Sequence, residues 1–269
     1  MFAWELRTAL AVALLRKLRT SNRRSGFVAV GPILKGPLLR ILPLIRWLLG
    51  EADKIVCFSL AECEAQARLL GLPRERFVFL PTAWESEPTA MDDEGYVLAL
   101  GHSSRDYATL LEAVRGTDVP VIIAAKEAAN LGGAILPPNV TGRYRTESEE
   151  TNRLVGGARL HVIPLHDSAH SAGQSVLLRA MAKGKAVVVT DTAGVRDYVQ
   201  DGETAVLVPA GDAMALRAAL LRLWGNSEER QRIGKNAARI QRQDFSFPHF
   251  TRSLVAVAEE VVHVRQLRS

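Results

Sequence analysis

Residues 160–190 of this chain, LHVIPLHDSAHSAGQSVLLRAMAKGKAVVVT, decide its fold. Leu160–Leu165 is a short apolar run typical of a buried parallel strand, and His166–Gly173 is a polar loop with turn-forming residues. From Gln174 onward the apolar side chains recur at helical spacing, and Ala186–Val189 is a second apolar run. The stretch therefore predicts a strand, a loop, a helix and a strand, which together form a right-handed βαβ crossover.

The loop of this unit is a candidate site for an anion. His170–Ser175 supplies hydroxyl groups and backbone N–H groups at the N-terminus of the predicted helix, where negative charge is favoured. Gly173 gives the backbone the freedom that close approach to a phosphate requires, although turn formation alone also explains a glycine there. His170 fits a ligand contact or an ordinary polar loop residue, and both interpretations stay open.

Residues 170–212, HSAGQSVLLRAMAKGKAVVVTDTAGVRDYVQDGETAVLVPAGD, resemble the donor-binding segment of the group 1 (family 4) glycosyltransferases. Ala180–Val187 matches the end of the family motif, Ala-Met-Ala-x-Gly-x-Pro-Val, with Ala186 in place of the proline. In the family, one glutamate of this motif contacts the donor sugar and a second contacts the nucleotide ribose. Ser171 and Arg179 occupy those two positions here. The resemblance implies the GT-B fold.

A second segment supports the same family and predicts the domain organisation. Residues 51–83, EADKIVCFSLAECEAQARLLGLPRERFVFLPTA, resemble the last βαβ unit of the family's N-terminal domain, and Trp84–Glu94 is the candidate linker. The predicted parts are a shortened, acceptor-side N-terminal domain at 1–85, a nucleotide-sugar donor domain at 86–247, and a C-terminal helix at 248–269 that packs back toward the N-terminal part. The short front is explained equally by truncation and by a naturally short variant.

Strands alternate with helices along the whole chain, which predicts α/β architecture with parallel sheets. Residues 1–20 and Gly194–Val199 are each predicted to be helical, and Ser103 or Ser104 is the expected cap of a helix over Asp106–Arg115. The remaining predicted strands include Phe27–Val30, Ala52–Ser59, Phe77–Leu80, Tyr96–Leu100 and Val119–Ala125, and the last two predicted helices are Ser227–Arg242 and Pro248–Val264.

Charge is concentrated at the front of the chain. Of its 269 residues, residues 1–50 carry nine Lys or Arg against Glu5 alone, a net charge of +8. The whole chain carries +5, so residues 51–269 carry −3. The basic and apolar stretch 31–50, GPILKGPLLRILPLIRWLLG, is typical of a helix on an anionic membrane surface. It also fits a helix packed in its own domain with arginines at the rim, which is the simpler interpretation.

Other partners and compartments find less support. A nucleic acid is not expected, because the chain has no recognised binding module and no aromatic residues interleaved with basic ones. No segment predicts a transmembrane helix or a signal peptide, so we expect a cytoplasmic chain, peripheral to a membrane if residues 1–50 bind one. Cys57 and Cys63 lack metal-ligand spacing and are expected to be reduced.

A second loop adds candidate site residues. Gly101–Asp106, GHSSRD, resembles a glycine- and arginine-containing loop of the family, and the resemblance implies that Arg105 contacts the donor diphosphate, with His102 where an arginine is common. Lys126 ends the next predicted strand and offers a second charge, although a surface lysine or a solvated helix-start arginine explains these residues as well. The candidate donor-binding residues are Gly101, His102, Arg105, Lys126, His170, Ser171, Gly173, Gln174, Ser175 and Arg179.

The resemblance implies a hexosyltransferase-like enzyme. It would move a sugar from a nucleotide-diphosphate sugar to a glycan, lipid or small-molecule acceptor, with retention of configuration and without a metal or cofactor. No general base is identifiable in the sequence, so the catalytic residue stays unassigned. The alternative is a catalytically impaired GT-B-like domain that binds a nucleotide, or a partner at a membrane. The replacement of both glutamates favours this alternative. A nucleotide-sugar epimerase is a third and weaker interpretation.

Overall fold

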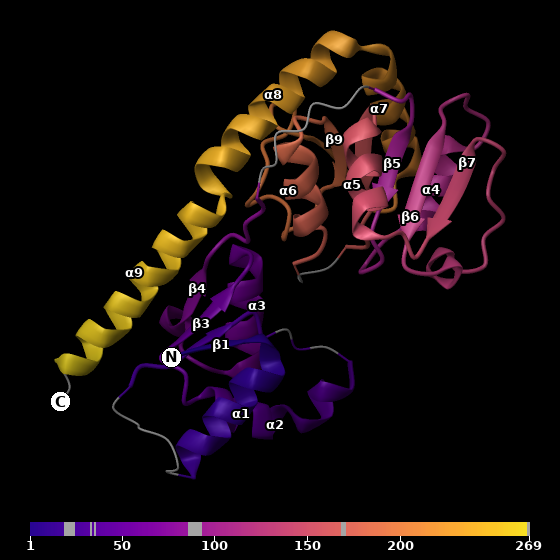
Figure 1. Ribbon diagram of the computed structural model, residues 1–269. Coiled ribbons are helices and arrows are strands. Elements are labelled where there is room, and N and C mark those ends of the chain that lie inside the picture. The colour runs from indigo at the N-terminus through magenta and orange to yellow at the C-terminus, as the bar shows by residue number, and fades with distance from the viewer. Residues whose placement is uncertain (19–24, 33, 35, 86–92, 168–170, 268–269) are drawn as a thin grey trace. The chain divides into compact units, whose positions relative to one another are not determined.

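The computed structural model describes residues 1–18, 25–32, 34, 36–85, 93–167 and 171–267, and it divides into two compact units (Figure 1). One unit contains residues 1–81 and 248–269, and the other contains residues 82–247. Each unit is built around a parallel sheet, as the alternation of strands and helices predicts. The C-terminal segment from Pro248 thus belongs to the same unit as the N-terminus.

The unit of residues 82–247 contains a six-stranded parallel sheet with the strand order β10-β9-β8-β5-β6-β7. Its strands are β5 (Val97–Leu100), β6 (Val121–Ala125), β7 (Val140–Tyr144), β8 (Leu160–Ile163), β9 (Val187–Thr190) and β10 (Val206–Val208). Its helices are α4 (Tyr107–Val114), α5 (Ser148–Gly157), α6 (Gln174–Ala182), α7 (Ala213–Gly225) and α8 (Ser227–Asp244), and η3 (Ala128–Leu131) is a 3₁₀ turn.

Helices cover both faces of this sheet. Leu110 of α4 and Leu220 of α7 belong to a core cluster on one face, and Val155 of α5 packs with Leu98 of β5 in a separate cluster. All residues of β8 and β9 are buried, which explains why their sequences are continuous apolar runs instead of alternating ones. The strand–loop–helix–strand prediction for residues 160–190 is confirmed by β8, α6 and β9.

The other unit contains a four-stranded parallel sheet in the order β1-β2-β3-β4. Its strands are β1 (Phe2–Trp4), β2 (Val28–Val30), β3 (Lys54–Cys57) and β4 (Phe77–Phe79). Its helices are α1 (Glu5–Lys17), α2 (Leu42–Leu49), α3 (Leu60–Leu70) and, from Pro248 onward, α9 (Phe247–Gln266), with 3₁₀ turns η1 (Gly36–Ile41) and η2 (Arg74–Arg76). Cys57 and Cys63 are free and buried.

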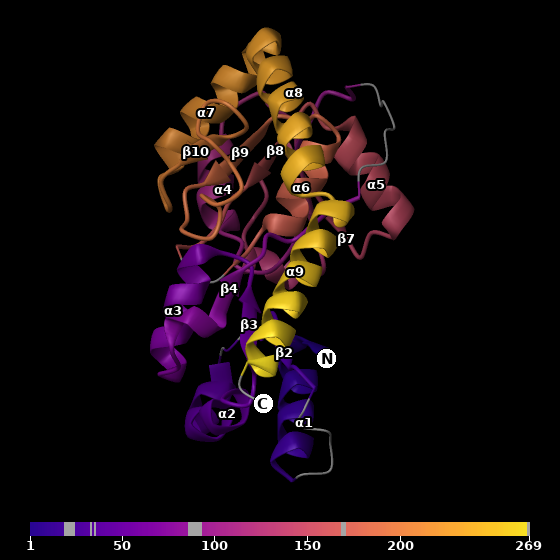
Figure 2. The same cartoon turned by 90° about the vertical axis from the view of Figure 1, so that its left-hand side faces the viewer.

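Helix α9 runs along the face of the small sheet that α1, α2 and α3 leave uncovered (Figure 2). Val257 and Val261 of α9 pack in one cluster with residues of β2 and β3. Gly26 allows this close approach, because a Cβ atom there would lie 2.5 Å from Cγ1 of Val261. Arg265 pairs with Asp53 at 2.9 Å, which adds a charged contact to the apolar one.

Three sequence predictions about local structure are wrong. Residues 1–20 do not begin as a helix, because Phe2–Trp4 pairs in parallel with Val28–Val30, a long-range contact that local periodicity does not reveal. Gly194–Val199 forms turns instead of a helix. The cap of α4 is Asp106, whose carboxylate accepts the N–H of Thr109 at 3.0 Å, and not Ser103 or Ser104.

None of the helices in the described part of the chain combines the length and the apolar character needed to cross a bilayer.

Candidate functional site

The larger sheet contains a point where the direction of strand order reverses. From β5 the chain continues to β6 and β7 on one side, and it then returns to β8, β9 and β10 on the other side. Open α/β sheets bind ligands outside the carboxyl ends of the strands at such a switch point. The segments at this place are Gly101–Asp106, which follows β5, and Pro164–Asp167, which follows β8.

Backbone hydrogen bonds hold these two loops together. The N–H of Asp106 donates to the carbonyl of Pro164 at 3.1 Å, and the N–H of His166 donates to the carbonyl of Ser104 at 3.0 Å. The structure therefore brings together two of the segments that the sequence analysis selected, although they lie about sixty residues apart in the chain.

Arg105 lies inside the first loop, with only 9% of its surface exposed. Its Nε donates to the carbonyl of Leu100 at 3.0 Å and its Nη1 to the carbonyl of Ser103 at 2.8 Å. Within the described ranges, no carboxylate forms an ion pair with this guanidinium, and burial lowers its pKa. A desolvated cation without a counter-ion favours the approach of an anion.

Gly101 makes room for Arg105. Its φ is +110°, and a Cβ atom at this position would lie 2.6 Å from Nη2 of Arg105. The hydroxyl of Tyr107 donates to the carbonyl of Gly101, and burial raises the pKa of Tyr107 to about 12. Tyr107 is a supporting residue that the sequence analysis missed, since its apolar ring fits the buried face of α4 and only its position beside the glycine loop hints at a second role.

The N-terminus of α6 forms the second part of the site. Gly173 is the N-cap of the helix with φ +87°, and among the described residues no side-chain hydrogen bond caps this helix start. Ser175 in that turn is exposed, and Ser171 is half-buried. Gln174 points elsewhere, because its buried side chain donates to the carbonyl of Gly194 at 2.9 Å and so anchors the loop.

Two exposed basic residues lie along the same edge of the sheet. Leu100 pairs with Ala124 in the β5–β6 register, so His102 and Lys126, which follow those strands closely, project from neighbouring strand ends. Both residues are exposed. The predicted site residue His170 lies outside the described residues.

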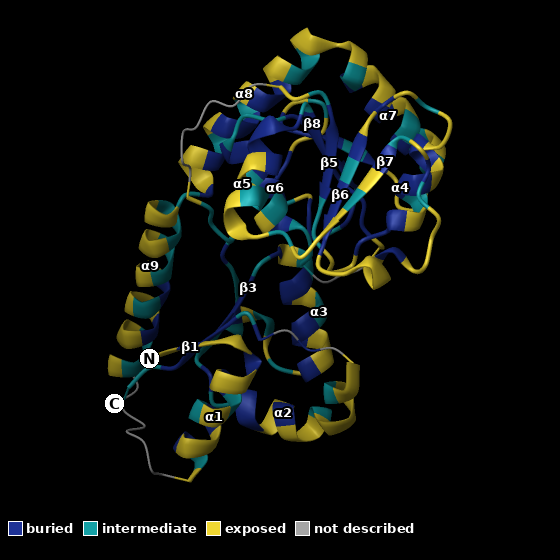
Figure 3. Ribbon diagram, turned by 45° about the vertical axis from the view of Figure 1, so that its right-hand side comes forward, coloured by how far each residue is buried: buried dark blue, intermediate teal, exposed yellow. Residues whose placement is uncertain are grey.

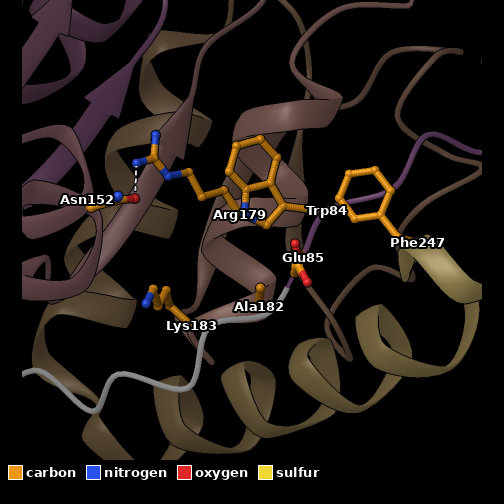
Figure 4. A pocket seen from close by; sticks show the side chains of 7 residues that line it. All are labelled: Trp84, Glu85, Asn152, Arg179, Ala182, Lys183 and Phe247. Carbon is orange, nitrogen blue, oxygen red and sulfur yellow. Dashed lines mark hydrogen bonds between the residues drawn. The ribbon is translucent and has the colours of Figure 1, made fainter. Parts of the chain in front are cut away.

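The structure does not bring Arg179 to this edge. Arg179 lines a cavity of about 290 Å³ together with Trp84, Asn152 and Phe247 (Figure 4). One guanidinium nitrogen donates to the side chain of Asn152, and the guanidinium carbon lies 5.4 Å from the centre of the Trp84 ring. The remaining lining residues are Glu85, Ala182 and Lys183.

In the residues that the structure describes, no group of three or more His, Cys, Asp or Glu side chains is arranged to hold a metal ion. The described edge instead offers a buried cation, exposed basic side chains and an uncapped helix N-terminus, which are the groups that proteins use to bind phosphates.

Comparison with known proteins agrees with this arrangement. The family model described as "Glycosyl transferases group 1" matches residues 108–226. D-rhamnosyltransferase WbpZ of Pseudomonas aeruginosa is 30% identical over 143 residues, which are 51% of this chain and 37% of that protein. Phosphatidyl-myo-inositol mannosyltransferase of Mycobacterium leprae is 43% identical over 72 residues, 26% of this chain and 19% of that protein. This chain thus spans well under half the length of either relative.

The fold has close counterparts among solved structures. Anabaena HepE, solved in complexes with UDP and with UDP-glucose, superposes with a TM-score of 0.74 over 96% of this chain and 78% of its own at 14% identity. At this level of identity the likeness concerns the fold. Residues 108–226 are therefore similar to the group 1 glycosyltransferases, and the chain has the GT-B fold that its sequence predicts.

Proposed function

We propose that the chain transfers a sugar from a nucleoside-diphosphate sugar to an acceptor hydroxyl. One observation carries the proposal: the buried Arg105 and the start of α6 meet at the switch point of the sheet, since Arg105 forms a β-bridge with Leu165 and a Cβ atom at Gly173 would lie 3.5 Å from Cδ1 of Leu165. Both groups favour negative charge at one place, as a diphosphate requires. The family match to residues 108–226 supports the same activity.

The reaction breaks the bond between the anomeric carbon and the diphosphate oxygen and forms a bond from that carbon to the acceptor oxygen. The acceptor hydroxyl loses its proton, and the diphosphate leaves with the electron pair of the broken bond. Lys126, His102 and the N–H groups of α6 would stabilise the charge on the leaving group. Retention of configuration and independence from metal ions are parts of the proposal that rest on the family resemblance.

A uridine nucleotide is the first donor to test, because HepE has been solved with UDP and UDP-glucose. Among acceptors, we favour a lipid over a free glycan or small molecule. One relative is named for a phosphatidyl-myo-inositol substrate, and residues 1–50 of this chain carry a net charge of +8 that suits an anionic membrane. We accordingly propose a cytoplasmic location with peripheral contact to a membrane.

A second candidate function is nucleotide binding without sugar transfer. Ser171 and Arg179 stand where the family resemblance implies glutamates, and Arg179 contacts Trp84 and Asn152 instead of the sheet edge. A domain that has lost both carboxylates could keep its affinity for the diphosphate and lose turnover. The two candidates differ in one measurable outcome, which is release of the nucleoside diphosphate from a sugar donor.

Calorimetric titration with UDP, GDP and ADP tests the shared part of both candidates. We expect saturable binding of one nucleotide, weakened about tenfold by Lys126→Ala, which removes one charge–phosphate contact, and more strongly by Arg105→Ala. Arg239→Ala is the matched control, because Arg239 is an exposed residue on α8 that bonds only Gln243 among the described residues. Thermal unfolding of each variant separates loss of binding from loss of structure.

Donor assays with the sugar forms of the bound nucleotide then decide between the candidates. Release of the nucleoside diphosphate with glycosylated product supports the transferase. Tight binding with no release supports the binding domain. Failure of all three nucleotides to bind, or an equal loss in Arg239→Ala, contradicts the proposed site.

A further inference from the structure

The outer side of α2 and the turn before it exposes large apolar side chains within the unit of residues 1–81 and 248–269. Helix α2 has both buried and exposed residues (Figure 3). It buries Ile45, Leu48 and Leu49 in the core of its unit, yet Leu44 and Trp47 are each 50% exposed. A surface helix normally confines its apolar residues to one stripe. Helix α2 departs from this pattern, because it carries apolar residues on both sides.

The exposed surface continues into neighbouring segments. The 3₁₀ turn η1 has no buried residue, and Leu39 and Ile41 are exposed there. The end of α1 lies beside α2, since the Lys17 ammonium is 4.7 Å from the centre of the Trp47 ring, and Leu14 and Leu18 of α1 are exposed. We call this set the α1–α2 surface, and it consists of Leu14, Leu18, Leu39, Ile41, Leu44 and Trp47.

Basic residues outnumber acidic ones around the α1–α2 surface, where Glu51 is paired with Lys17 at 2.8 Å. Arg40 and Arg46 are exposed between its apolar members, and Arg7 lies on the same face of α1 as Leu14 and Leu18 at helical spacing. Glu5 is the single acidic residue of the first fifty, and it begins α1 at the end remote from Leu18. Exposed leucines and a tryptophan among arginines match the chemistry of helices that lie in the headgroup region of anionic membranes.

We propose that the α1–α2 surface docks on an anionic phospholipid bilayer. A second copy of the chain is a poorer occupant, because two surfaces from regions that each carry +8 repel one another. Leucine and isoleucine side chains insert among acyl chains, and Trp47 is suited to the interface, where aromatic side chains concentrate.

The location of the surface has a consequence for the acceptor. Gly31 follows the carboxyl end of β2, the edge at which parallel sheets bind ligands, and the exposed turn η1 begins at Gly36. A lipid-borne hydroxyl in the bilayer would therefore be presented to that edge. This consequence rests on the proposed sugar transfer, whereas the docking itself does not.

Vesicle co-sedimentation of the full chain tests the docking. The probes are vesicles of phosphatidylcholine mixed with phosphatidylglycerol, and vesicles of phosphatidylcholine alone. We expect binding to the anionic vesicles, and a loss of about tenfold or more when the double change Leu44→Ser and Trp47→Ser removes two large apolar side chains. The matched control is Met214→Ser with Leu221→Ser on α7, two exposed apolar residues of the other unit.

Charge is tested separately from apolar contact. Arg7→Gln with Arg40→Gln should weaken binding to anionic vesicles, and Arg239→Gln with Arg242→Gln on α8 should leave it unchanged. Added salt should weaken the binding of the unchanged chain. Equal binding to both kinds of vesicle would overturn the anionic specificity and with it the proposal.

Two further outcomes would also overturn the proposal. One is equal vesicle binding by the Leu44→Ser/Trp47→Ser variant and its control. The other is a dimer in sedimentation velocity that this variant converts to a monomer, with no vesicle binding, which would assign the surface to a second copy. UDP titration of the same variant keeps the two hypotheses apart, because docking and nucleotide binding use different residues and each can fail alone.

Discussion

Helices α3 and α6 occupy equivalent places in the two sheets, but only one of them has a closed N-terminus. Both follow a buried parallel strand, α3 after β3 and α6 soon after β8. At α3 the hydroxyl of Ser59 accepts the N–H of Glu62 at 3.0 Å, and the Glu62 carboxylate accepts the N–H of Phe58 at 2.9 Å. The Ser59 hydroxyl thus caps α3, and the Glu62 carboxylate holds the N–H of the residue before the cap, an arrangement close to a capping box.

Helix α6 has neither element of that cap. Gly173 takes the place of the serine and lies in the left-handed region, and the third helical residue is Val176 where α3 has Glu62. In the described part of the chain no side chain caps the first turn of α6, and the loop that carries the buried Arg105 is hydrogen-bonded to Pro164 and His166, which precede α6 in the chain. The same βαβ architecture thus has a helix with a capped N-terminus in one unit and, in the other, a helix whose N-terminus can bind an external anion.

Transferring the α3 carboxylate to α6 should abolish the difference. Val176→Glu places a carboxylate at the third position of α6, where it would compete with a diphosphate for the N–H groups and repel its charge. We expect nucleotide affinity to fall at least about a hundredfold, or about 3 kcal/mol, as like charges in close contact cost several kcal/mol. Calorimetric titration measures the loss.

Val176→Gln is the control for this change, since glutamine has nearly the same size as glutamate and carries no charge. Retained affinity in the glutamate variant would show that the ligand does not use the N-terminus of α6. Equal losses in both variants would assign the effect to packing, because Val176 is half-buried.

Acid should destabilise the unit of residues 82–247 through a buried histidine. His161 in β8 is fully buried, and desolvation lowers its pKa to about 4, with Nε2 3.0 Å from the carbonyl oxygen of Val155. The unfolded chain takes up a proton near pH 6.5 and the folded chain does not, so stability is full above pH 6.5 and falls as the pH approaches 4. The expected loss between pH 6.5 and pH 4.5 is about 2 kcal/mol.

Denaturant unfolding across this pH range measures the loss. Carboxylates titrate in the same window, so the relevant quantity is the difference between the chain and His161→Leu, a variant of similar volume that cannot take up a proton. The variant should lose stability less steeply as the pH falls. Parallel pH dependences would show that His161 does not titrate differently in the two states.

The contrast between α3 and α6 also marks what the sequence reveals. The βαβ unit at residues 160–190 was predictable, because buried parallel strands are continuous apolar runs and α6 has clear helical periodicity. The short strand β1 was not, since three residues gain their structure from pairing with β2 and not from local preference.

The candidate site was predictable in part. Gly101, Arg105 and the loop before α6 were recognised from their residue types and from the family resemblance, and the structure brings their loops together. The destination of Arg179 was not predictable, because its contacts with Trp84 and Asn152 depend on packing between distant segments. The role of Gln174 as an anchor to Gly194 was hidden for the same reason.

Removal of the cap of α3 should have a smaller effect, which is a loss of stability. Ser59→Ala removes the hydroxyl that caps α3, and loss of such a cap costs about 1 kcal/mol. Ser227→Ala on α8 is the control. It also removes a serine hydroxyl at a helix start, but the side chain of Asn226, and not that of Ser227, caps α8. Chemical denaturation measures the cost, and UDP titration of Ser59→Ala should give the affinity of the unchanged chain. If removal of the α3 cap instead created a second nucleotide site, an uncapped helix start after a parallel strand would be sufficient for binding. The contribution of Arg105 to binding at α6 would then be smaller than proposed.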